Sequence, residues 1–80
     1  MPYRVIVSFR RGVEDSVELS SFCAARRAVR EVQARLQREE GAVRAPDGED
    51  IFVTLVRTES PFGRVLLFRR YRIKGKEGWL

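Results

Sequence analysis

The amino-acid sequence predicts an α+β domain with two layers in the order ββαββ, one helix packed on one face of a four-stranded, mainly antiparallel sheet. Four segments show the residue types and the two-residue alternation of strands. Only one segment shows the three- and four-residue spacing of a helix. The length of 80 residues allows a single domain. Because one helix covers only one face of such a sheet, the other face is either open or covered by the tail with Trp79.

The first two strands are predicted to form a hairpin. Residues 3–9 alternate between two faces, with Tyr3, Val5, Val7 and Phe9 on one and Arg4, Ile6 and Ser8 on the other. Residues 11–15 form the turn, where Gly12 permits a positive φ. Residues 16–19 return as a short strand, and we expect Val17 and Leu19 to face the core.

The helix is predicted over residues 21–40. Ser20 and Ser21 are of the type that caps a helix N-terminus, and Gly41 is of the type that ends one. One apolar stripe runs between them at spacings of three and four, and it consists of Phe22, Ala25, Val29, Val32 and Leu36. This stripe is expected to pack on the sheet.

The second half of the chain is predicted to form two long strands. Residues 42–50 read as a loop, residues 51–58 as a central strand that is apolar on both faces, and residues 59–63 as a hairpin loop. Residues 65–74 form the last strand, and the domain is taken to end there, with 75–80 as a C-terminal tail.

The last strand contains one conflict with the expected alternation. Its parity places Arg69 on the core face together with Val65, Leu67, Tyr71 and Ile73. A β-bulge near Arg69 and Arg70 would remove the conflict. Alternatively, the strand extends beyond the helix there and Arg69 is solvated.

The composition argues against several functional classes. The chain has no His, which excludes imidazole-dependent catalysis and zinc sites with His ligands, and it has no Gly-rich phosphate loop. Neighbouring carboxylates point apart in a strand or helix. We therefore expect a non-enzymatic binding protein with no catalytic residue, metal or cofactor. The longest apolar run, 65–68, is too short to cross a membrane. The single cysteine, Cys23, favours a reducing, cytoplasmic location.

The net charge of +5 is concentrated near the end of the chain. Residues 69–76 contain five basic residues and no acidic one, so the rest of the chain is balanced. A basic face with Phe68 or Tyr71 nearby could hold a phosphate backbone and stack a base. This favours nucleic acid, RNA or DNA, as the partner. The candidate binding residues are Arg4, Arg10, Arg69, Arg70, Tyr71, Arg72, Lys74 and Lys76.

Two other interpretations remain open at the level of sequence. The chain could be a protein-binding inhibitor or adaptor, of the kind common in phage and mobile elements, that docks on an acidic protein through Phe62, Trp79, Arg27 and Arg30. The apolar residues on the open sheet face, among them Ile6, Phe52 and Val56, could also form a homodimer. The simplest explanation of the charges is that they keep exposed strands from aggregating.

Overall fold

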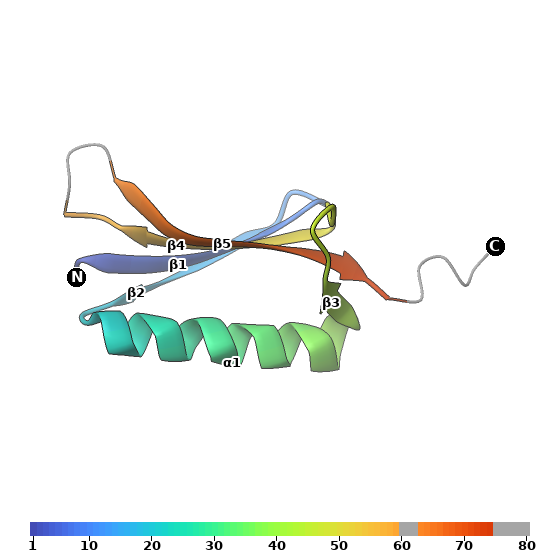
Figure 1. Ribbon diagram of the computed structural model, residues 1–80, viewed down its shortest axis with the longest axis horizontal. Coiled ribbons are helices and arrows are strands. Elements are labelled where there is room, and N and C mark those ends of the chain that lie inside the picture. The colour runs from blue at the N-terminus through green and yellow to red at the C-terminus, as the bar shows by residue number, and fades with distance from the viewer. Residues whose placement is uncertain (60–62, 75–80) are drawn as a thin grey trace.

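The computed structural model describes residues 1–59 and 63–74, which form a helix on one face of an antiparallel sheet (Figure 1). The helix is α1 (Phe22–Glu40). The strands are β1 (Tyr3–Phe9), β2 (Glu14–Leu19), β3 (Ala42–Arg44), β4 (Ile51–Arg57) and β5 (Arg64–Ile73). Their order across the sheet is β2-β1-β4-β5-β3. The predicted α+β class is confirmed, but the sheet has five strands where the sequence predicted four.

The additional strand is β3, which the sequence assigned to a loop. Gly41 ends α1 in the left-handed conformation, with φ of 64°, and turns the chain toward β5. Ala42–Arg44 then pairs antiparallel with the last residues of β5, and the Lys74 N–H donates to the Gly41 carbonyl oxygen at 2.7 Å. Three residues are too few to show an alternation in the sequence, which is why this strand was missed.

The helix agrees with its predicted bounds. The Ser21 side chain accepts a hydrogen bond from the Ala24 N–H at 3.1 Å and so caps the first turn. The stripe is buried at Ala25, Val29, Val32 and Leu36. Its first member is an exception, because the Phe22 ring packs beside Tyr3, with ring centroids 5.9 Å apart, and stays 43% exposed.

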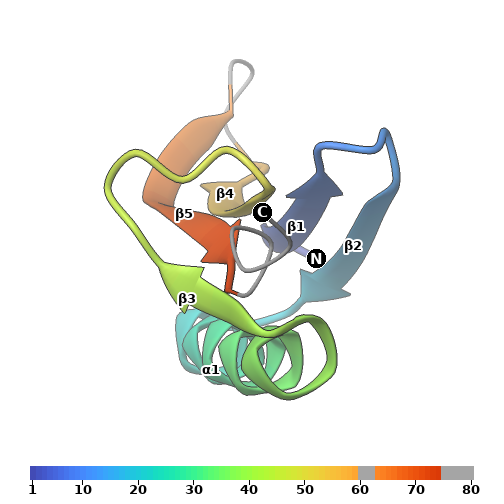
Figure 2. The same cartoon turned by 90° about the vertical axis from the view of Figure 1, so that its right-hand side faces the viewer.

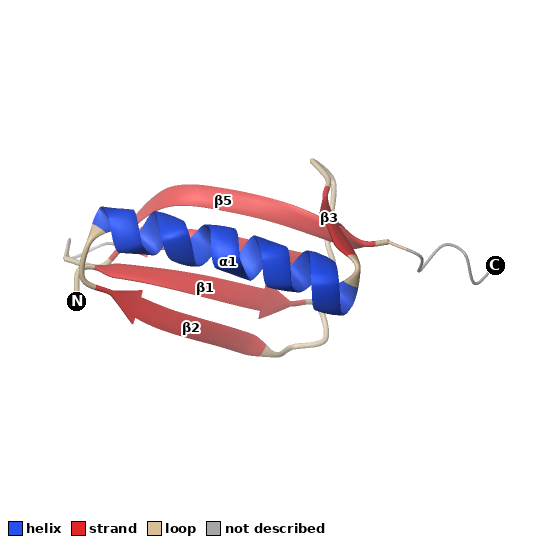
Figure 3. Ribbon diagram, turned by 90° about the horizontal axis from the view of Figure 1, so that it is seen from below, coloured by secondary structure: helices blue, strands red, loops and turns tan. Residues whose placement is uncertain are grey.

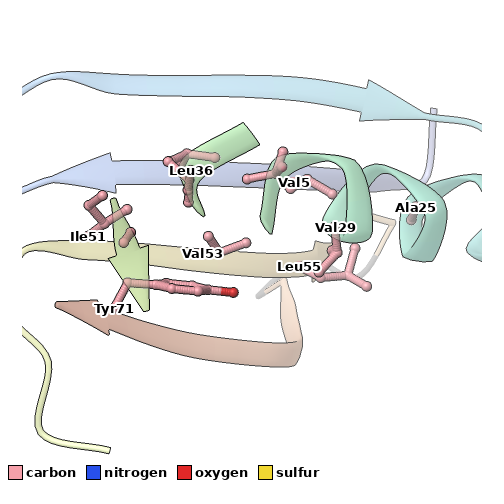
Figure 4. Close-up of a cluster of buried hydrophobic side chains, with 11 residues drawn as sticks. Val5, Ala25, Val29, Leu36, Ile51, Val53, Leu55 and Tyr71 are labelled. Carbon is pink, nitrogen blue, oxygen red and sulfur yellow. The ribbon is translucent and has the colours of Figure 1, made fainter. Parts of the chain in front are cut away.

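The core lies between α1 and the centre of the sheet (Figures 3 and 4). Its largest fully buried side chains, Val5, Ile51, Val53 and Leu55, come from β1 and β4. The prediction that residues 51–58 form a central strand is confirmed, since β4 lies between β1 and β5. Val17 lies opposite Val5 and therefore on the face toward α1, as predicted. It is not buried there, because it stays 46% exposed at the edge of the sheet.

The register of β5 settles the position of Arg69. The register shifts between the pairs Leu55–Leu67 and Val56–Val65, where β5 contains the additional residue Leu66. This bulge is not near Arg69, where one alternative predicted it. Arg69 therefore stays opposite Val53 on the side that faces α1, and Arg70 lies on the open side. The alternation of the last strand holds through its basic segment.

Among the described residues no helix combines the length and apolar character that a membrane crossing requires.

Candidate functional site

The sheet face opposite α1 carries an exposed aromatic ring and basic side chains of β5. Figure 2 shows the helix below the sheet and no element over the opposite face in the described part of the chain. Strand pairing places an apolar row across this face, which ends at two arginines on β5. The row and its arginines are Ile6, Phe52, Thr54, Val56, Val65, Phe68, Arg70 and Arg72.

Two phenylalanines form an aromatic platform on the open face. The rings of Phe52 and Phe68 stack with centroids 5.7 Å apart and an interplanar angle of 16°. The guanidinium carbon of Arg70 lies 5.7 Å from the centroid of Phe52, within cation–π range. Phe68 is 49% exposed, so part of its ring is available to another flat group.

A shallow hollow of about 540 Å³ adjoins this platform. Phe68, Arg69 and Arg70 line it from β5, Arg44 lines it from the end of β3, and Ala45 and Pro46 line it from the chain that follows. Arg70 also fixes this chain, because its Nε–H donates to the carbonyl oxygen of Gly48 at 2.8 Å. The hollow therefore brings an exposed aromatic ring together with guanidinium groups from two segments distant in sequence.

The close packing of the loop after β3 depends on Gly48. A Cβ atom at this position would lie 2.6 Å from the backbone carbonyl carbon of Tyr71. The loop thus lies directly against β5 and holds Pro46 at the edge of the hollow, next to Arg44 at the end of β3. Arg44 was not among the candidates because it fell in a predicted loop, and Phe52 was placed on the open face only as part of a possible dimer surface.

The structure separates the candidate nucleic-acid residues into several places. Arg72 is exposed on the open face, Lys74 follows β5, and Arg10 is exposed in the turn after β1. Arg4 donates to the Glu18 carboxylate at 2.7 Å, and this hydrogen bond and the charge of Arg4 lower the pKa of Glu18. Lys76 lies outside the described residues.

The candidates for a protein partner are placed only in part. Phe62 and Trp79 lie outside the described residues. Arg27 and Arg30 are both exposed on α1, and Arg30 lines a small cavity toward β5.

Tyr71 lies in the core and not on the open face. It is 3% exposed and packs against the buried helix and strand residues (Figure 4). Its hydroxyl oxygen is buried and has no hydrogen-bond partner of ordinary geometry within the described part of the chain. Burial raises the pKa of Tyr71 above its ordinary value of 10.0, while the Gln33 side chain, which can hydrogen-bond to the hydroxyl, and the positive charges of Arg44 and Arg69 act in the opposite direction.

Replacing Tyr71 with phenylalanine is expected to raise the free energy of unfolding by about 1 kcal/mol, because an unpaired buried hydroxyl costs about 1–3 kcal/mol. This corresponds to a rise in melting temperature of roughly 4–8 °C for a domain of this size. Because the pKa of Tyr71 is raised in the folded protein, ionisation of its hydroxyl favours the unfolded chain. The free energy of unfolding of the wild type should therefore fall as pH rises above 10.0, and Tyr71→Phe should not show that loss. Thermal unfolding across this pH range, with Tyr3→Phe as the matched control, measures both effects. A Tyr71→Phe variant less stable than wild type would contradict the unpaired hydroxyl.

Another hollow, of about 680 Å³, lies between α1 and β2, and its charges have both signs. Asp15 and Glu31 line it together with Arg35 and Arg38, above an apolar floor that includes Val17. Carboxylates beside the arginines disfavour an anionic ligand there. In the described ranges no three metal-ligating side chains come together.

Comparison of the chain with family models, with curated proteins and with solved structures finds no match. The functional argument therefore depends on the geometry of the open face and its hollow.

Proposed function

We propose that this protein binds single-stranded nucleic acid along β5, with a base on the exposed ring of Phe68 and phosphates on the surrounding basic side chains. The observation that carries the proposal is the hollow in which this half-exposed ring meets Arg44 and Arg70. Base stacking on an aromatic side chain contributes about 1–3 kcal/mol per base and tolerates any sequence. The bases of a duplex are not accessible to such a platform, which favours a single strand.

The charges along β5 suit a phosphate backbone. Arg69, Arg70 and Arg72 lie on β5, Lys74 follows it, and Arg44 lies at the hollow from β3. No acidic residue of the described ranges lines the hollow. Guanidinium groups match the geometry of phosphate oxygens and also stack on rings, as Arg70 does on Phe52. The proposal is for a binding protein without catalysis, acting in the cytoplasm as the lone cysteine suggests.

The experiment is a salt titration of the affinity for a short fluorescent single strand, in DNA and RNA forms, by fluorescence anisotropy. If five basic residues contact phosphates, the logarithm of the binding constant should fall against the logarithm of salt with a slope of about −3.5. The paired change Arg70→Gln/Arg72→Gln should reduce the slope by about 1.4 and weaken binding about 25-fold near 0.1 M salt.

The matched control is Arg35→Gln/Arg38→Gln, which removes the same charge from exposed positions on α1. It should retain nearly the wild-type slope. Absence of binding at low salt, or equal losses in the two paired variants, would overturn the proposal. Circular dichroism of each variant separates lost binding from lost folding, because Arg70 also holds the Gly48 loop.

A further inference from the structure

A small cavity on the helix side of β5 is lined by four arginines. Its volume is about 120 Å³, which corresponds to roughly four water molecules in the liquid. Arg26 and Arg30 come from α1, Arg44 from β3 and Arg69 from β5. The remaining lining residues are Val29, Gln33 and Leu67, so no acidic side chain from residues 1–59 or 63–74 lines the cavity.

None of these four arginines forms an ion pair with an acidic side chain in the described part of the chain. Elsewhere in the same part, Arg4, Arg11 and Arg57 pair with Glu18, Glu40 and Glu59, which shows that acidic partners are used where they are close. Like charges gathered in one place repel one another. A bound anion would remove that repulsion.

Arg69 is the least expected of the four. It occupies a position whose neighbours on the same face of β5, Leu67 and Tyr71, pack against the core. An apolar residue there would extend that packing, whereas Arg69 has no carboxylate to offset its charge. A break in a regular pattern of this kind is typical of a functional position.

A second observation points to a ligand at this cavity. The Tyr71 hydroxyl is an unused, buried hydrogen-bond donor, and Gln33, Arg44 and Arg69, which act on its pKa, all line the cavity. Buried polar groups without a partner are rare in folded proteins. Tyr71 itself is not among the lining residues, so its hydroxyl would respond to a ligand through Gln33, Arg44 or Arg69.

We propose that this cavity binds a phosphate monoester, the doubly charged group found at the end of a nucleic-acid strand and in free phosphate. The volume suits one such group. Four guanidinium groups match a dianion better than the single charge of a phosphodiester. Because Arg44 and Arg69 line both this cavity and the hollow beside Phe68, a strand on the open face could place its terminal phosphate here; this assignment of the source rests on the proposed function.

The test compares strands of one sequence that carry a 5′-phosphate, a 3′-phosphate or only hydroxyl ends, together with inorganic phosphate alone. Affinity is measured by anisotropy, and the effect of inorganic phosphate by thermal unfolding against chloride at equal ionic strength. The test variant is Arg26→Gln/Arg30→Gln, whose residues line only this cavity and are exposed on α1. The control is Arg35→Gln/Arg38→Gln on the same helix.

A phosphate at one end should strengthen binding about tenfold in the wild type and the control, the effect of one charge-assisted hydrogen bond, and should have no effect in Arg26→Gln/Arg30→Gln. That result supports the strand end as the source. A rise in melting temperature with inorganic phosphate in wild type and control alone, without an end preference, supports free phosphate. No effect of either probe, or equal effects in both paired variants, overturns the inference.

These outcomes separate the inference from the proposed function. Salt-dependent binding of hydroxyl-ended strands without any phosphate effect would overturn the cavity and leave the proposed function in place. A phosphate effect without binding of hydroxyl-ended strands would support the cavity and overturn the proposed function.

Discussion

Replacing Leu55 with alanine is expected to lower the free energy of unfolding by about 2–5 kcal/mol, the usual cost of truncating a buried leucine. Leu55 is 1% exposed and lies in the central strand β4, opposite Val5 on one side and Leu67 on the other. Domains of this length have a total stability of roughly 4–12 kcal/mol. The substitution would therefore remove a large part of the stability, and the melting temperature should fall by more than about 10 °C.

Urea denaturation measures this loss, and Leu66→Ala is the matched control. Leu66 is 38% exposed and lies at the bulge between the pairs Leu55–Leu67 and Val56–Val65, so the same change should cost less than about 1 kcal/mol. Equal losses at the two positions would mean that the bulge is misplaced and that the register of β5 differs from the one described.

Replacing Phe68 with alanine is expected to weaken binding of a single strand by about 5- to 150-fold, which corresponds to about 1–3 kcal/mol for one stacked base. Phe68 is 49% exposed and stacks with Phe52, with centroids 5.7 Å apart. Because half of its surface is already in water, the free energy of unfolding should change far less than for Leu55→Ala. Phe68→Ala is thus expected to weaken binding with little loss of stability, and Leu55→Ala to lower the stability of the fold.

Anisotropy titration at one salt concentration measures the effect, with Val65→Ala as the control. Val65 lies on the same strand and the same face and is 60% exposed, but it has no ring on which a base can stack. Its substitution should leave the affinity within about twofold, as expected of a residue outside the contact. If Phe68→Ala binds as well as Val65→Ala, Phe68 is not a stacking platform.

The helix and the long strands could be predicted because each repeats its pattern over enough residues. α1 carries a four-member buried stripe between a serine cap and Gly41. β1 and β4 alternate over 7 residues each, and their buried positions follow that alternation. The position of the helix on one face of the sheet followed from the same reasoning, since a single helix cannot cover both sides.

The fifth strand could not be predicted, and one site residue was missed with it. Ala42–Arg44 is too short to show a period, and it becomes a strand because it follows the turn at Gly41 and meets the edge of β5. Arg44, at its end, lines both the hollow and the small cavity. Only the pairing of β3 with β5 brings Arg44 to the hollow and to the small cavity.

The basic residues that β5 contributes to the candidate site could be predicted from the sequence, but their arrangement on the two faces of this strand could not. The sequence located the basic segment and the ring of Phe68, and it placed Phe52 on the open face as part of a possible dimer surface. It did not bring the two rings together, because they lie on different strands. It grouped Arg69 and Tyr71 with Arg70 and Arg72, although strand alternation turns the first two toward α1. Linear clustering of charge does not distinguish the two faces of a strand.

The most direct test of the account is to map a bound single strand onto the protein by nuclear magnetic resonance. On addition of a short strand to isotope-labelled protein, the backbone amide signals of Arg44, Phe52, Phe68 and Arg70 are expected to shift together and to saturate at one affinity. The signals of β2 and of the hollow between β2 and α1 are expected to stay in place. Shifts confined to that hollow, or no shifts at low salt, would contradict binding along β5.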